Sequence, residues 1–173
     1  MKKTAPPRPD LIDHLRSDWQ AERPDLDTSA MDIVGRILLL SEALKKSASV
    51  TLRPFDIGYT DLDVLATLRR SGAPYRLRPA DLLGTVLIQS GSLTACLDRL
   101  EKRSLVKRTQ TEADRRSRSV QLTEKGKTLI DRAIEARFAE AAGVVEGLSQ
   151  PEAEGMASLL RKLLANNTTE ETR

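Results

Sequence analysis

The residues of this chain best suited to chemistry are basic, and they gather in one stretch of the sequence. Between Arg99 and Arg118 there are eight lysines and arginines against three acidic residues, so this stretch carries a net charge of +5. The whole chain carries +3, which leaves the remainder slightly acidic. A local basic patch suits a polyanion such as DNA, whose phosphates attract it over a long range. On charge alone, a solvated charged face is the alternative interpretation.

Cysteine and histidine, the usual nucleophiles and metal ligands, are scarce. The chain has one cysteine, Cys96, and one histidine, His14, which we expect to be exposed and without a catalytic partner. These counts exclude a disulfide within the chain, a tetrahedral cysteine/histidine zinc site and any catalytic triad that does not use His14. The motifs G-x-x-x-x-G-K, G-x-G-x-x-G and G-x-S-x-G do not occur in the sequence. We therefore expect neither an enzyme nor a cofactor.

The apolar runs of the sequence are far shorter than the roughly 20 residues that a helix needs to cross a bilayer. The first residues, 1–7, lead into charge rather than into an apolar signal core. We expect a cytoplasmic protein with no membrane association. Cys96 lies in an apolar stripe, where a lone thiol usually packs inertly, and redox sensing is the less favoured alternative.

Apolar residues recur at three- and four-residue spacing over most of the chain, which predicts helices. Asp10 is the expected N-cap of the first helix, in which Leu11, Leu15 and Trp19 share a face that must pack against another element. Near the basic stretch, two short segments with strand character flank a charged tip and predict a hairpin. The expected helices span about residues 10–23, 28–49, 60–70, 79–83, 90–102, 124–148 and 150–164, and the expected strands span 75–77, 105–109 and 117–122.

A short helix, a longer helix and a charged hairpin, in this order, predict a winged helix-turn-helix. This fold places one helix in the major groove of DNA and the hairpin on the minor groove or the backbone. The expected fold class is therefore mainly α, with a winged helix-turn-helix, a helical dimerisation lobe and a small β wing. The candidate DNA-binding residues are Gln89, Ser90, Ser92, Thr94 and Arg99 at the second helix and Arg115 and Arg116 on the wing.

Each of these candidates has a simpler alternative. Ser90 could serve only as a helix cap, and Arg115 and Arg116 could belong to a solvated turn. Asp114 is acidic at a turn that faces DNA, so we expect it to orient a nearby guanidinium by a charge-assisted hydrogen bond, with Arg99 as the candidate.

Three segments of the sequence resemble the MarR family of bacterial transcription regulators. They are residues 97–106, LDRLEKRSLV, residues 114–116, DRR, and residues 122–126, LTEKG, which are similar to that family's recognition-helix end, wing signature and start of the long helix. The resemblance covers about residues 29–165. It implies a triangular homodimer on a pseudo-palindromic operator, controlled by a small molecule that binds between the DNA-binding and dimerisation lobes. The long helices agree with a dimer, because they carry more apolar surface than one subunit could bury.

The extra first helix is similar to that of the urate-responsive and PecS-like branch of this family. In that branch a tryptophan of this helix and an aspartate before the helix-turn-helix serve the ligand site, and Trp19 and Asp63 match those positions. Cys96 stands where the branch has an arginine, which argues against urate-like ligands. The simpler roles are a core anchor for Trp19 and a favourable helix N-terminal charge for Asp63.

We thus expect five segments: a flexible tail (1–9), N-terminal dimerisation helices (10–50), the winged helix-turn-helix (51–122), C-terminal dimerisation helices (123–165) and a second flexible tail (166–173). The expected function is a ligand-responsive repressor that binds double-stranded DNA as a homodimer. The alternatives are a helical protein-interaction module with a degenerate wing and an architectural DNA-binding protein without a ligand.

Overall fold

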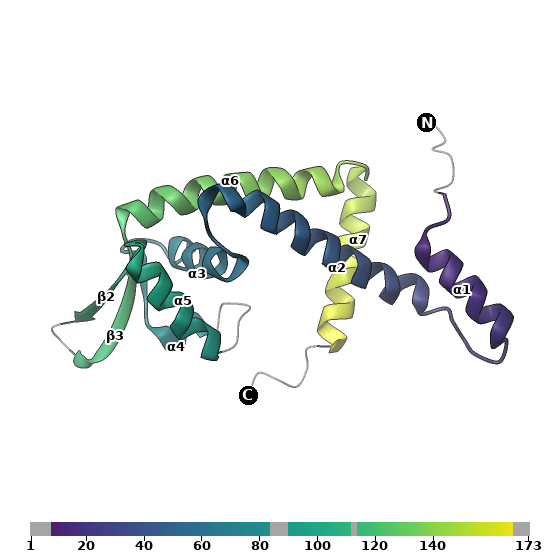
Figure 1. The fold of residues 1–173 in the computed structure, drawn as a ribbon, viewed down its shortest axis with the longest axis horizontal. Coiled ribbons are helices and arrows are strands. Elements are labelled where there is room, and N and C mark those ends of the chain that lie inside the picture. Colours follow the sequence, from purple (N-terminus) through teal and green to yellow (C-terminus); the bar gives the residue numbers. More distant parts are fainter. Residues whose placement is uncertain (1–7, 84–89, 112–113, 168–173) are drawn as a thin grey trace. The chain divides into compact units, whose positions relative to one another are not determined.

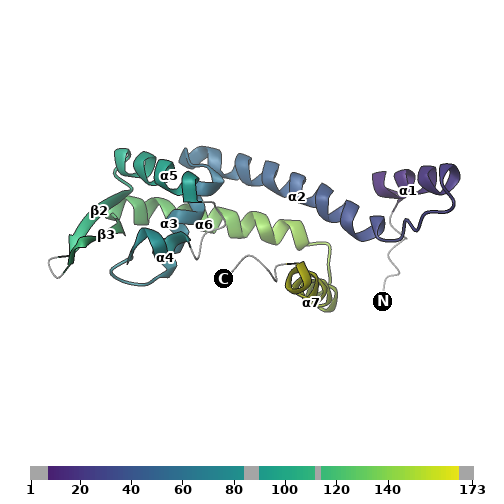
Figure 2. The ribbon, with the colours of Figure 1, turned by 90° about the horizontal axis from the view of Figure 1, so that it is seen from below.

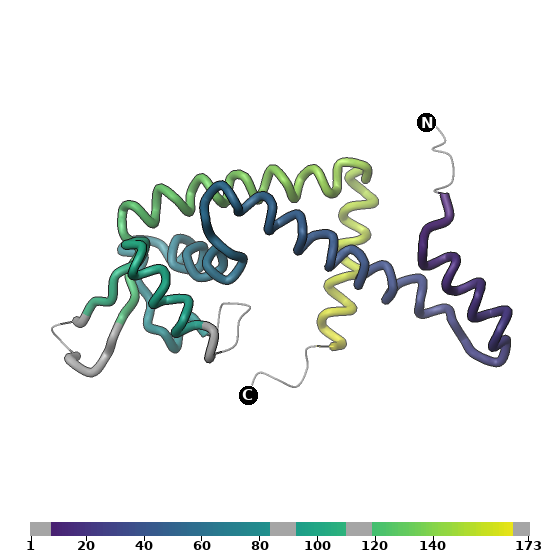
Figure 3. Tube along the Cα trace, viewed as in Figure 1, coloured from purple at the N-terminus to yellow at the C-terminus, as the bar shows by residue number. Residues whose placement is uncertain are grey.

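The computed structural model contains seven α-helices, one 3-10 helix and three short strands within the residues that it describes (Figure 1). These residues are 8–83, 90–111 and 114–167, with the backbone alone for 90–92, 110, 111 and 114–118 (Figure 3). In chain order the elements are α1 (Leu11–Glu22), α2 (Met31–Leu52), η1 (Arg53–Phe55), α3 (Tyr59–Arg70), β1 (Arg76–Leu77), α4 (Pro79–Leu83), α5 (Ser90–Lys102), β2 (Val106–Thr111), β3 (Asp114–Leu122), α6 (Glu124–Val145) and α7 (Gln150–Asn167). The chain divides into two compact units, Met1–Val50 and Thr51–Arg173. Over the described residues, no helix combines the length and the apolar character of a membrane span.

The first unit holds α1 and most of α2. Asp10 caps α1 as predicted, because its side chain accepts hydrogen bonds from the backbone N–H groups of Ile12 and Asp13. Leu11, Leu15 and Trp19, which are predicted to pack against another element, are exposed in the single chain, so their packing stays a prediction, and the buried residue of the helix is Ile12. Ile12 is buried because α1 approaches α2 closely at this residue.

Ile12 packs at Gly35 of α2, where a Cβ atom would lie 2.6 Å from the Ile12 Cδ1 atom. Arg36, next along α2, donates to Asp10 at 2.8 Å and to Asp13 at 2.7 Å, so both residues of the α1 capping box are fastened to α2. The apolar contact and the ion pairs therefore turn the Ile12 face of α1 toward α2.

The second unit has the hydrophobic core of the protein. It draws on α3, α4, α5, the sheet and α6, and its buried members are Leu52, Ile57, Val64, Leu65, Leu68, Leu82, Leu93, Cys96, Leu97, Leu100, Leu105, Val106, Val120, Leu122, Ile130 and Ala133. The apolar stripe predicted around Cys96 is confirmed as the inner face of α5, where Leu93, Cys96, Leu97 and Leu100 are buried.

The three strands form one antiparallel sheet in the order β1-β3-β2. The β2–β3 hairpin projects from the helices of this unit, beside the end of α5 (Figures 1 and 2). Its strands are longer than predicted: Thr111 pairs with Asp114, so Asp114, Arg115 and Arg116 belong to β3 rather than to a protruding turn. The prediction relied on alternating apolar residues, but the outer part of a two-stranded wing lies beyond the core and can pair its backbone without them.

The start of α6 is joined to the turn that follows α5. Thr123 caps α6 by accepting from the Gly126 N–H at 2.9 Å, and its hydroxyl donates to the Ser104 carbonyl at 2.8 Å. Gly126 has no room for a side chain, because a Cβ atom there would lie 2.0 Å from the Leu105 carbonyl oxygen. The end of the helix-turn-helix is thereby fixed to the first turn of the long helix.

Candidate nucleic-acid interface

The helix-turn-helix consists of α4 and α5, and the outer face of α5 is open to solvent. Thr94, Asp98, Arg99 and Lys102 are exposed on this face, while the opposite face packs into the core. Of the predicted DNA-binding residues, Thr94 and Arg99 thus lie together on one exposed surface. Ser90 and Ser92 lie in the first turn of α5, but their side chains are outside the described part, as are those of Asp114, Arg115 and Arg116; Gln89 lies outside the described residues altogether.

Arg99 is held by a carboxylate that the sequence did not suggest. Its Nη2 and Nε donate to Oδ1 of Asp61, in the first turn of α3, at 2.5 and 3.2 Å. The expected partner was Asp114 on the wing, whose side chain lies outside the described part, so that pairing stays a prediction; the described carboxylate that holds Arg99 is Asp61. The two residues are 38 positions apart, and only the packing of α3 against α5 brings them together.

Asp61 is a carboxylate with a very small exposed surface. Burial alone would raise its pKa, but hydrogen bonds from Arg99, the Gly58 N–H and the Cys96 thiol outweigh burial and hold the pKa below the ordinary value of 3.8. Asp61 therefore carries its negative charge at neutral pH.

Cys96 meets the same carboxylate from the buried side of α5. Its Sγ lies 3.2 Å from Asp61 Oδ1, and burial together with this contact raises the pKa of the thiol to about 12. A protonated, enclosed thiol is a poor nucleophile, so the geometry favours the packing role of Cys96 over redox sensing.

A second arginine, Arg108 of β2, connects the wing to α5. Its Nη1 donates to Glu101 at 2.6 Å, its backbone N–H donates to the same carboxylate at 3.0 Å, and its Nη2 pairs with Asp98. In the sequence, Arg108 stands out only as one of the eight basic residues between Arg99 and Arg118. The sequence does hold a signal for this ion pair, because Glu101 precedes Arg108 by seven residues across one tight turn. Local spacing alone, however, does not show which charges pair.

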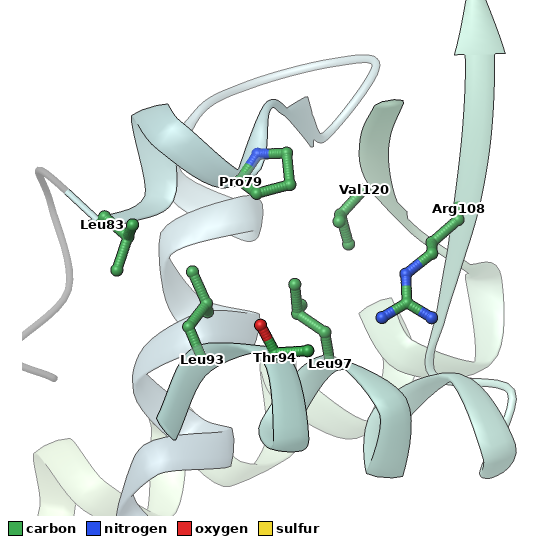
Figure 4. Close-up of a pocket in the computed structure, with 7 residues that line it drawn as sticks. All are labelled: Pro79, Leu83, Leu93, Thr94, Leu97, Arg108 and Val120. Atoms are coloured by element: carbon green, nitrogen blue, oxygen red, sulfur yellow. The ribbon is translucent and has the colours of Figure 1, made fainter. Parts of the chain in front are cut away.

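A pocket of about 310 Å³ lies between α4, α5 and the sheet (Figure 4). Apolar side chains face its interior, and the Thr94 hydroxyl and the Arg108 guanidinium stand at its edge. The lining residues are Pro79, Leu83, Leu93, Thr94, Leu97, Arg108 and Val120. The recognition helix and the wing thus share a small cavity as well as an ion-pair cluster.

Asp63, predicted to serve a ligand site, lines a different pocket, of about 400 Å³, between α3 and α6. Its apolar part comes from Leu62, Ala66, Ile134 and Phe138, and its polar part from Tyr59, Asp63, Arg69, Arg70 and Arg137. Arg69 bridges the two helices by an ion pair with Asp131 at 2.7 Å. Trp19, the other predicted ligand residue, belongs to the first unit, and its meeting with Asp63 stays a prediction.

A helix-turn-helix whose second helix leads into an antiparallel hairpin, with a third short strand against it, defines a winged-helix protein. The model of the MarR family matches residues 57–117. The transcriptional regulator PecS of Dickeya dadantii (strain 3937) is 33% identical over 90% of this chain and 96% of its own length. The protein therefore belongs to the MarR family: it is a winged-helix, DNA-binding transcriptional regulator and not an enzyme.

Solved structures agree with this assignment of the fold. A mutant of MarR from E. coli, complexed with operator DNA, superposes with a TM-score of 0.67 at 24% identity, covering 80% of this chain and 99% of that one. BpsR of Bordetella bronchiseptica, whose DNA binding is regulated by 6-hydroxynicotinic acid, superposes with a TM-score of 0.68 at 22% identity, covering 80% and 96%. The predicted resemblance to the MarR family, with its PecS-like branch, is confirmed.

Proposed function

We propose that this protein binds a pseudo-palindromic DNA operator as a homodimer in the cytoplasm and represses transcription until a small molecule releases it. The observation that carries the proposal is the open outer face of α5, placed next to a wing in the most basic stretch of the chain. In this arrangement α5 enters the major groove and the wing reaches the flanking backbone. The E. coli relative solved on its operator supports the same mode of binding.

The homodimer is supported by apolar side chains that a single chain leaves exposed. They lie on α2 (Ile33, Val34, Ile37, Leu38, Leu39, Leu40, Leu44 and Val50) and on α7 (Met156, Leu159, Leu160, Leu163 and Leu164). Exposed apolar surface on this scale is typical of an interface between subunits. Two identical recognition helices then read two half-sites.

We expect Arg116→Ala to weaken operator binding by about 1 to 3 kcal/mol and to lower the salt dependence of binding by about one phosphate contact. A guanidinium on the wing suits the minor groove or the backbone. The measurement is a mobility shift at two salt concentrations with DNA from upstream of the gene. Lys45→Ala is the matched control, because Lys45 is an exposed cation of α2 that pairs with Glu42, and it should leave affinity unchanged. Full affinity of a folded Arg116→Ala protein would contradict the role of the wing.

The effector site that we propose is the pocket of Asp63 between α3 and α6. Its apolar floor and its three arginines suit a small planar molecule with a negative charge. A molecule bound there acts on α3, which packs against both α5 and α6. Occupancy can therefore favour one placement of the recognition helices over another by differential affinity.

We expect Asp63→Asn to blunt release from DNA while sparing DNA affinity itself. The probes are aromatic carboxylates and phenols, including the 6-hydroxynicotinic acid that regulates BpsR, added to the operator complex. A tenfold higher concentration for half-release corresponds to about 1.4 kcal/mol of lost coupling. Trp19→Ala tests the other predicted ligand residue in the same assay. An unchanged response of both variants would mean that Trp19 is only a core anchor and Asp63 only a favourable charge at a helix N-terminus. If no probe releases the protein from the operator, the architectural DNA-binding protein without a ligand is favoured instead.

A further inference from the structure

We propose that Asp61 is a positioning residue for DNA binding, which holds the Arg99 guanidinium on the outer face of α5 so that one end of it is presented to a DNA phosphate. This inference rests on the proposed DNA-binding function. Asp61 itself touches no DNA in this arrangement and acts only through Arg99.

The carboxylate of Asp61 is fixed from three sides. One oxygen accepts the Gly58 N–H at 3.0 Å, which closes the first turn of α3. The other oxygen accepts both Arg99 and Cys96. The Asp61 side chain is only 5% exposed, so it is a rigid anchor that solvent cannot replace.

The guanidinium of Arg99 has the opposite character, because its side chain is 49% exposed. Its two described hydrogen bonds to Asp61 use Nε and Nη2, which form one edge of the planar group. That edge faces Asp61, so the N–H groups of Nη1 lie on the side of the guanidinium away from the carboxylate. No described residue pairs with Nη1, so this end of the guanidinium can donate to a phosphate oxygen.

Preorganisation is the advantage of such a contact. A free arginine side chain loses rotamer freedom when it is fixed on a ligand. With Asp61 as anchor, part of this cost is met in the folded protein, before DNA arrives. The alternative is that the ion pair only fastens α3 to α5 and caps α3.

A double-mutant cycle in the full-length protein separates these roles. Asp61→Asn and Arg99→Met should each raise the Kd for operator DNA about fivefold to tenfold, and the double variant should bind no more weakly than Arg99→Met alone, because Asp61 acts only through that arginine. Arg99→Met should also lower the salt dependence by about one phosphate contact.

Two further variants separate the geometry of Arg99 from its charge and supply a control. Arg99→Lys retains the charge and leaves the cap of α3 intact, yet a lysine cannot be held along an edge, so the Kd should rise about as much as in Arg99→Met. Lys45→Ala changes an exposed cation of α2 outside this cluster and should leave the Kd unchanged. Thermal unfolding checks that each variant is folded.

Additive effects in the cycle, or full affinity of Arg99→Lys, would overturn the positioning role while leaving DNA binding in place. An unmodified protein without salt-dependent affinity for its upstream DNA would overturn the proposed function, and this inference with it.

Discussion

Gly126→Ala should lower the free energy of unfolding by about 3 kcal/mol, a large effect for the addition of one methyl group. The added Cβ atom would lie 2.0 Å from the carbonyl oxygen of Leu105 and 2.9 Å from its carbonyl carbon. Both are backbone atoms of the turn between α5 and β2, which cannot swing aside as the end of a flexible side chain can. The same carbonyl accepts the Thr123 N–H at 3.1 Å, so a shift also strains the cap of α6.

The same helix offers a matched control. Nothing lies within 4 Å of a Cβ atom added at Gly143. Gly143→Ala should therefore gain about 0.5 to 1 kcal/mol from helix propensity alone. Urea unfolding followed by circular dichroism, at one fixed protein concentration because a dimer's stability depends on it, measures both variants. Equal stability of the two would contradict the tight junction between α5 and α6.

Leu159→Asp combined with Leu164→Asp should convert the dimer into a monomer. These side chains are 66% and 63% exposed in one chain, and α7 has no buried residue of its own. A helix that buries nothing within its chain needs a partner to cover its apolar stripe. Burying two carboxylates in that contact without partners costs several kcal/mol. Analytical ultracentrifugation across a range of concentrations reports the change in mass.

Ser158→Asp supplies the control for the dimer, because at 100° per residue Ser158 lies on the opposite side of α7 from the leucines. It should leave the mass of the dimer unchanged. Deletion of residues 149–173 removes the whole helix and should have the stronger effect. A truncated protein that stays soluble and monomeric and melts cooperatively would show that the interface lies elsewhere.

Features with a local cause could be predicted from the sequence. The cap at Asp10, the inner stripe of α5 and the short strand β1 all depend on residues within a few positions of one another. The winged helix followed from the order of these elements. The family resemblance followed from three short segments.

Features that depend on packing between distant segments could not be predicted. The pair of Asp61 and Arg99 joins two helices, and neither residue has a neighbour in sequence that marks it. Apolar spacing in α1 identified a stripe but not whether the same chain covers it, and the covered residue is Ile12. The outer wing strand, which begins at Asp114, has no apolar alternation that could have located its start.

The cluster of Arg108 with Asp98 and Glu101 also bears on how specificity in this protein could be re-engineered. Two of these three charges belong to the helix that would be exchanged in a recognition swap, and the third belongs to the wing. A grafted helix without both acids would leave the arginine unpaired and the hairpin free to tilt. The graft would then change two properties at once: the bases that the protein reads and the length of DNA that its helix and wing cover. A clean exchange of operator preference therefore requires that the two acids be carried over with the new helix.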